Sequence, residues 1–219
     1  QDDGVLEVVA LPGHEGHEQV LAQGQVALVG GGTVGQHVAQ GHGLALVDEH
    51  GLLPLSDDEL RAVLEAYDGV PLKKTATRLV FADGNPKARV MFVGEAPGRE
   101  EDIEGLPFVG RSGKLLNLMM AAIGLDRTSA YIANIIPWRP PGNRTPTPQE
   151  SAICLPFVRK QIELVNPDVL VCLGGPSMQT LLGVKEGIKR SRGRWMPYDT
   201  GTREIRALAT FHPAYLLRQ

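Results

Sequence analysis

Short apolar runs alternate with helix-like segments along residues 90–211, and this alternation limits the possible folds more than any other feature. Each run spans four to seven residues and stops at Gly, Pro or His, as short buried strands do. The predicted strands cover residues 90–93, 131–136, 169–173 and 205–211. Strands that alternate with helices form a parallel sheet with right-handed crossovers and helices on both faces. The sequence therefore predicts an α/β fold.

Helix signals occupy the segments around these runs. Ser56 and Glu59 form a capping-box pattern, and Thr147 and Glu150 form a second one with Pro148 at the first helical position. The predicted helices cover residues 56–67, 112–125, 147–165 and 174–182, and a short strand is predicted at residues 80–81.

Residues 1–50 differ in composition from the rest of the chain. They contain ten glycines, five of the six histidines and no aromatic residue, so they offer little from which to build a core. The histidines lack a regular ligand spacing, and no metal site is expected there. We expect residues 1–50 to be a tail, a poorly ordered extension or a mis-assigned start, outside a domain of residues 51–219. Since the first residue is Gln rather than Met, we also expect a fragment or a processed form.

Charge and cysteine content restrict the partners and the compartment. Residues 1–50 hold seven of the 25 acidic residues and none of the 22 basic ones, so residues 51–219 carry a surplus of four positive charges, compatible with a polyanionic partner. The two cysteines, Cys154 and Cys172, are too few for a disulfide framework and indicate a reducing compartment. No apolar run approaches the ~20 residues of a membrane span, so no membrane partner is expected.

Unusual residues follow each predicted strand. Glu95 follows the first strand, Asn134 lies near the end of the second, Gly174 and Gly175 follow the third, and His212 follows the fourth. The carboxyl ends of parallel strands share one edge of the sheet, where ligands bind in such folds. Asn presents a donor and an acceptor together, and Phe108 can stack on a ring, so a flat hydrogen-bonding ligand is indicated. Each residue also has a structural interpretation: Asn134 as a strand cap, Phe108 as core and His212 as a satisfied buried histidine.

Charged residues near this edge leave two interpretations open. Glu95, Glu100, Glu101 and Asp102 crowd the first strand end, as either a ligand site or a solvated acidic turn. Arg139, Arg144 and the basic stretch 185–194 point to a base held on a phosphate backbone, although a solvated basic loop is the default for the last of these.

Four ordered motifs make the comparison with a known family specific. They are GEAPGREED at residues 94–102, GLPFVGRSG at 105–113, Asn134 with RPPGNRTP at 139–146, and HPAYLLR at 212–218. Over about residues 67–219 the chain resembles the family-4 uracil-DNA glycosylases. The resemblance implies a three-layer α/β/α domain with a central four-stranded parallel sheet, and removal of uracil from DNA.

The resemblance also implies roles for individual residues. Glu95 would hold a water beside the attacked sugar carbon, and His212 would stabilise charge on uracil O2. Phe108 would stack on the flipped base, Asn134 would bind O4 and N3, and Glu101 would press against the C5 edge. Gly94 and Ala96 complete the predicted uracil pocket. The predicted DNA contacts are Arg139, Asn143, Arg144, Pro213, Leu216, Leu217 and Arg218, with a leucine as the wedge that enters the duplex.

One departure from the family concerns its iron–sulfur cluster. The four cysteine positions of the family correspond here to Tyr67, Val70, Trp138 and Cys154. A cubane held by thiolates needs four of them. We therefore expect no metal and no cofactor, and a monofunctional glycosylase, because no lysine lies in the motifs to form a Schiff base.

Two other functions remain open from the residues alone. One is a non-catalytic protein that binds abasic or damaged DNA on the same fold, and the other is a small-nucleotide hydrolase, although no phosphate-loop motif is present. We expect a monomer located in the cytoplasm of a bacterial-type cell, with the nucleoid. Because the chain stops directly after HPAYLLR, where a further helix is expected, we also expect the domain to be truncated at its C-terminus.

Overall fold

A computed structural model describes residues 27–30, 33–40, 43–48, 51–52 and 56–219, with side-chain surroundings from residue 56 onward. Its central element is a mixed sheet of strand order β5-β7-β6-β8-β10-β9. The strands are β5 (Asp83–Gly84), β6 (Val90–Gly94), β7 (Ala130–Asn134), β8 (Val169–Leu173), β9 (Met196–Asp199) and β10 (Glu204–Thr210). The four central strands are parallel, as predicted. The short strands β5 and β9 add an antiparallel edge on each side, so the sheet has six strands rather than four.

The helices follow the predicted order with some additions. They are α1 (Asp57–Ala66), α2 (Arg99–Glu104), α3 (Arg111–Ala121), α4 (Pro148–Val165), α5 (Gly175–Leu182), α6 (Ile188–Ser191) and α7 (Pro213–Leu216), with 3-10 turns η1 (Pro71–Lys74) and η2 (Pro141–Asn143). Both predicted capping boxes are present, at Ser56 and at Thr147. The short helices α2, α6 and α7 are not predicted from the sequence. The strand predicted at residues 80–81 is wrong, because Val80 N–H donates to the Pro137 carbonyl at 2.8 Å instead of joining the sheet.

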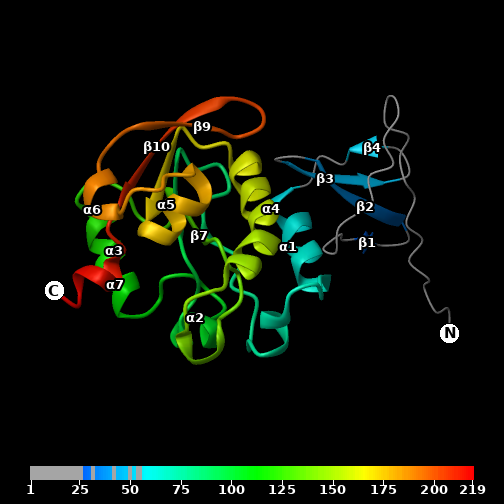
Figure 1. The fold of residues 1–219 in the computed structure, drawn as a ribbon, viewed down its shortest axis with the longest axis horizontal. Helices are drawn as coiled ribbons and strands as arrows, with labels where there is room; N and C mark the ends of the chain where they lie inside the picture. The colour runs from blue at the N-terminus through cyan, green and yellow to red at the C-terminus, as the bar shows by residue number, and fades with distance from the viewer. Residues whose placement is uncertain (1–26, 31–32, 41–42, 49–50, 53–55) are drawn as a thin grey trace.

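Helices lie on both sides of the central sheet, with α1 and α4 on one side and α3 on the other (Figure 1). Side chains on both faces of the sheet are therefore buried. Met91 and Val93 of β6 belong to the larger apolar cluster, together with side chains of α1, α4 and α5. Phe92, between them in the strand, points to the other face and joins Leu116 and Met120 of α3. Near-continuous apolar runs in the central strands are therefore explained by burial on both faces.

Four further strands form a separate antiparallel sheet, with strand order β1-β2-β3-β4. Its strands are β1 (Ala27–Gly30), β2 (Thr33–Gln40), β3 (Gly43–Asp48) and β4 (Gly51–Leu52). The sequence pattern does not predict these strands. That residues 1–50 lie outside the domain stays a prediction, and much of that segment lies outside the described residues.

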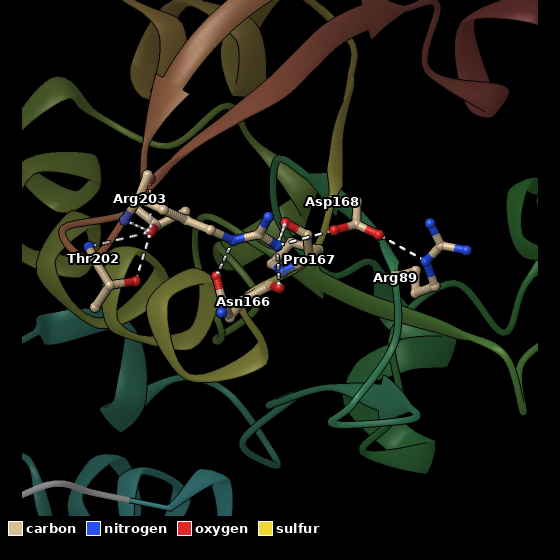
Figure 2. A network of polar contacts seen from close by, with 7 residues as sticks. Arg89, Asn166, Pro167, Asp168, Thr202 and Arg203 are labelled. Carbon is tan, nitrogen blue, oxygen red and sulfur yellow. Dashed lines mark hydrogen bonds and ion pairs between the residues drawn. The ribbon is translucent and has the colours of Figure 1, made fainter.

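Different residues lie at the amino ends and at the carboxyl ends of the parallel strands. At the amino ends of β6 and β8, Asp168 Oδ2 accepts from Arg89 Nε at 2.6 Å and Asp168 Oδ1 accepts from Arg203 at 3.0 Å. Arg203 also donates to the side chain and carbonyl of Asn166 and to the Pro167 carbonyl (Figure 2). Pairing with Arg89, and then with Arg203, lowers the pKa of the Asp168 carboxyl. This network joins the β9–β10 turn to the end of α4, and the carboxyl edge is left for the predicted site.

Candidate active site

A cavity of about 480 Å³ opens at the carboxyl edge of the parallel strands. Its lining includes these predicted site residues: Glu95, Ala96, Glu101, Phe108, Asn134, Asn143, Arg144, His212 and Arg218. Gly94, Arg139, Pro213, Leu216 and Leu217 do not line it, although Gly94 lies directly behind it. The cavity also contacts Gly174 and Ile188, which lie outside the four motifs, and Tyr215, which lies in the fourth motif but has no predicted role. The strand order thus brings together groups that are far apart in the sequence.

Asn134 is the last residue of β7 and is 4% exposed. Its Oδ1 is the one buried side-chain polar atom without a hydrogen-bond partner among residues 56–219. In the sheet Asn134 pairs with Gly94, where an added Cβ would lie 2.5 Å from Asn134 Oδ1 and 2.6 Å from Phe108 Cζ. Glycine at position 94 therefore leaves room for both side chains. A buried acceptor without a partner costs free energy, so its place on a cavity wall indicates a ligand that donates.

Phe108 is both a core residue and a residue of the cavity wall, which the sequence alone left as alternatives. It is 4% exposed and packs with the apolar cluster under α3, yet it also lines the cavity. Its ring lies against the His212 imidazole with centroids 5.3 Å apart and planes at 29°. Its backbone is in the left-handed region at φ +54°, which bulky residues rarely adopt.

His212 is the N-cap of α7, and its Nδ1 accepts from Ala214 N–H at 3.0 Å. Because Nδ1 is an acceptor, the neutral ring carries its proton on Nε2. Burial, followed by the nearby Arg218, lowers the pKa of His212 to about 4, and Glu101 opposes this shift. The imidazole at neutral pH is therefore an uncharged donor.

Glu95 lies directly after β6, half-buried on the cavity wall. Its backbone carbonyl accepts from Ile136 N–H at 3.0 Å, which fixes the turn against the end of β7. Burial raises the pKa of its carboxyl. A partly desolvated carboxylate that lines the same cavity as a neutral imidazole is suited to general-base and electrostatic roles.

Backbone amides hold two neighbouring acids, Glu101 in the cavity wall and Asp102 outside it. Glu101 Oε2 accepts from Gly98 N–H at 3.0 Å, and Oε1 accepts from Val109 and Gly110 at 3.1 and 3.2 Å. Asp102 Oδ1 accepts from Thr77 and Arg78 N–H at 2.7 and 3.1 Å. Both carboxylates are buried, so the interpretation of this stretch as a solvated acidic turn is wrong for them.

The arginines of the proline-rich loop are engaged within the protein. Arg144 donates to both carboxylate oxygens of Glu150, at 2.9 and 2.6 Å, and this pairing lowers the pKa of Glu150 to about 2. Arg139 Nε donates to Asn143 Oδ1 at 2.6 Å. These bonds shape the cavity mouth, while DNA contact by these residues stays a prediction.

Comparison with known proteins agrees with the geometry. The family model described as "Uracil DNA glycosylase superfamily" matches residues 81–219. The chain belongs to the uracil-DNA glycosylase superfamily. A protein of Thermotoga maritima named "Type-4 uracil-DNA glycosylase" is 46% identical over 149 residues, covering 68% of this chain and 76% of that protein. A protein of the same name from Archaeoglobus fulgidus is 41% identical over 165 residues, covering 74% of this chain and 82% of that protein.

The cluster implied by the family-4 resemblance does not fit the residues of this superfamily member. Tyr67, Val70, Trp138 and Cys154 are all buried in the larger apolar cluster, where the Tyr67 ring packs on Phe157 with centroids 5.1 Å apart. Burial raises the pKa of the Cys154 thiol to about 12, so it is protonated. Within the described part of the chain, no group of three or more His, Cys, Asp or Glu side chains is arranged to hold a metal ion. Aromatic and aliphatic packing takes the place of the thiolates.

Iron analysis and a Cys154→Ala variant test this packing. We expect purified protein to lack stoichiometric iron, and the variant to lose about 1 kcal/mol of unfolding free energy, as for a modest core truncation. Its rate of uracil release should match the unaltered chain. Iron that is bound by the original protein and lost from the variant would contradict this account.

Proposed function

We propose that this chain removes uracil from DNA by hydrolysing the N-glycosidic bond of a flipped deoxyuridine, leaving an abasic site for base excision repair. The observation that supports this proposal most strongly is that Asn134 Oδ1 has no hydrogen-bond partner and lies on the wall of a cavity. Glu95, Phe108 and His212 line the same cavity. Both relatives described above are named type-4 uracil-DNA glycosylases, which supports the same activity for this chain.

Recognition follows from the donors and acceptors of the imide edge. Asn134 Oδ1 accepts from uracil N3–H while its amide donates to O4, and the ring stacks on Phe108. Glu101 fixes the wall that meets the C5 edge, because three backbone amides hold its carboxylate. A wall that cannot yield discriminates against the methyl group of thymine.

The chemical step uses opposite charges on the two halves of the substrate. The bond between the sugar carbon and uracil N1 breaks, and its electron pair leaves with the base. The Glu95 carboxylate stabilises the cationic sugar and takes a proton from the attacking water, whose oxygen bonds to the sugar carbon. Neutral His212 donates from Nε2 to O2, where negative charge develops.

DNA is held around the cavity mouth. Leu216 and Leu217 are 37% and 40% exposed, and we propose that one of them fills the space left by the flipped nucleotide. Pro213 starts the helix that presents them, and Arg139, Asn143, Arg144 and Arg218 provide the predicted contacts to the strand. No helix in the described residues is long and apolar enough to cross a membrane. We also propose that the protein acts as a monomer on nucleoid DNA in the cytoplasm.

The pH profile tests the protonation states. The pKa of His212, lowered to about 4, makes the neutral ring dominant throughout neutral pH, and the raised pKa of Glu95 places the loss of activity on the acid side. We expect the single-turnover rate to rise with pH as Glu95 ionises and then to stay flat past the ordinary histidine pKa of about 6.5. In Glu95→Gln the rate should fall about 10²–10³-fold. A tenfold decline per pH unit above that pKa would instead indicate a catalytic imidazolium.

A single-turnover assay on a uracil-containing oligonucleotide tests the function itself. We expect free uracil and an abasic strand that is cleaved only on treatment with alkali. Tight binding of abasic DNA without uracil release would favour the non-catalytic binder. Hydrolysis of free dUMP without any need for polymer would favour the nucleotide hydrolase.

A further inference from the structure

Arg127 lies outside all four motifs, in the turn between α3 and β7, and contacts the back of the loop that carries Phe108. Its Nη1 donates to Asp83 Oδ2 at 2.6 Å and to the Pro107 carbonyl at 3.0 Å. Its Nη2 donates to the Phe108 carbonyl, and its Nε donates to Asn117 Oδ1 at 2.9 Å. One guanidinium therefore connects β5, α3 and the Phe108 backbone.

The Phe108 backbone needs such a support. Among the described residues, three non-glycine residues have positive φ: Phe108, Asn143 and Asn166. Asparagine tolerates that region, whereas phenylalanine adopts it only when its surroundings hold it there. The Phe108 carbonyl also packs closely against the Gly113 backbone, because a Cβ added at Gly113 would collide with it.

The turn itself is built to present Arg127. Asp126 Oδ1 accepts from Thr128 N–H at 2.8 Å, from Thr128 Oγ1 at 2.6 Å and from Ser129 N–H at 3.1 Å. The side chains of Arg127 and Asp83 are only 23% and 26% exposed, so the pair is less screened than a fully exposed pair. Arg127 does not line the cavity, and it acts through the backbone of a residue that does.

We infer that Arg127 is a positioning residue for uracil recognition: by holding the Phe108 carbonyl, it fixes the plane of the ring on which the base stacks. This inference rests on the proposed function. It predicts that loss of Arg127 weakens binding of the base more than binding of the DNA backbone.

Arg203 provides a matched control (Figure 2). It also donates to two backbone carbonyls, one asparagine amide oxygen and one aspartate, but at the amino edge of the strands. Arg127→Ala and Arg203→Ala therefore remove similar sets of bonds, and only the first removes a bond to the cavity wall. Arg127→Lys keeps a charge for Asp83 but cannot reproduce the planar fork on the two carbonyls.

Four measurements separate positioning from general stabilisation: inhibition by free uracil, the single-turnover rate, affinity for DNA with a tetrahydrofuran abasic analogue, and the melting temperature. In Arg127→Ala we expect inhibition by uracil to weaken about tenfold and base release to slow about 10–100-fold, as for a lost stacking contact. Affinity for the abasic analogue should stay close to that of the unaltered chain. Arg203→Ala should lower the melting temperature and leave inhibition by uracil unchanged.

Several outcomes would overturn the inference. It is wrong if Arg127→Ala keeps normal inhibition by uracil and a normal rate, or if both alanine variants change every measurement equally. If Arg127→Ala does not fold, Arg127→Lys carries the same comparison, with a smaller expected loss. If the unaltered chain binds uracil without releasing it from DNA, the proposed function fails, and direct calorimetry of uracil binding to the variants still tests Arg127.

Discussion

Replacing Asn134 with alanine should reduce uracil release from DNA by about 10⁴–10⁵-fold, since a site built to hydrogen-bond its substrate discriminates by about that much when the bonds are lost. The variant loses the acceptor for N3–H and the donor for O4 together. Single-turnover kinetics with saturating enzyme measure the loss without a contribution from product release. A rate within tenfold of the unaltered chain would show that the amide does not read the base.

Asn143 offers a control for the loss of an asparagine from the same cavity. Its Oδ1 is already occupied by Arg139 Nε, and its backbone has φ +56°, so glycine is the substitution that avoids strain. Asn143→Gly should change uracil release by less than about tenfold, as expected for a residue at the rim of a binding surface. Any effect should fall mainly on affinity for DNA.

The unaltered Asn134 should itself reduce the stability of the fold, because its buried Oδ1 has no hydrogen-bond partner. An isosteric Asn134→Leu removes a buried oxygen that has no partner, and we expect the free energy of unfolding to rise by about 1 kcal/mol while activity is lost. Denaturant unfolding in the absence of ligand measures this directly. A large loss of stability would instead mean that the amide supports the fold.

The parts of the molecule that the sequence predicts correctly depend on local patterns. The central strands, the capped helices α1 and α4, and the placement of Glu95, Asn134 and His212 at one edge all follow from apolar runs, capping residues and strand order. Helix α2 is missed because its polar sequence, residues 99–104, has no apolar stripe. Its N3 residue, Glu101, is nonetheless at a position where a carboxylate bonds backbone amides.

Other features depend on contacts between distant segments and leave no local signal. Arg127 bonds Asp83, which is 44 residues away, and the carbonyls of Pro107 and Phe108, about 20 residues away. A single arginine in a turn is indistinguishable in sequence from a solvated one. The edge strands β5 and β9 are similar cases, because short polar strands are recognisable only once their neighbours are in place.

Replacing His212 tests whether the imidazole acts chemically or only closes the start of α7. Both His212→Ala and His212→Asn remove the Nε2 donor, so both should slow uracil release by about 10²–10³-fold, the cost of losing one preorganised donor. Asparagine is a good N-cap and can accept from Ala214 N–H as Nδ1 does now. His212→Asn should therefore retain the melting temperature, whereas His212→Ala should lose about 1 kcal/mol of stability.

The comparison of the two His212 variants separates the functions of one ring. Affinity for abasic DNA should change little in either, because the imidazole is assigned to the charge that develops as the base leaves and that charge is absent from the product complex. If His212→Asn keeps the normal single-turnover rate, the ring serves only as a cap. If both variants lose DNA affinity in proportion to rate, the residue contributes to binding in the ground state, and stabilisation of the departing uracil must come from another donor at the same edge of the sheet.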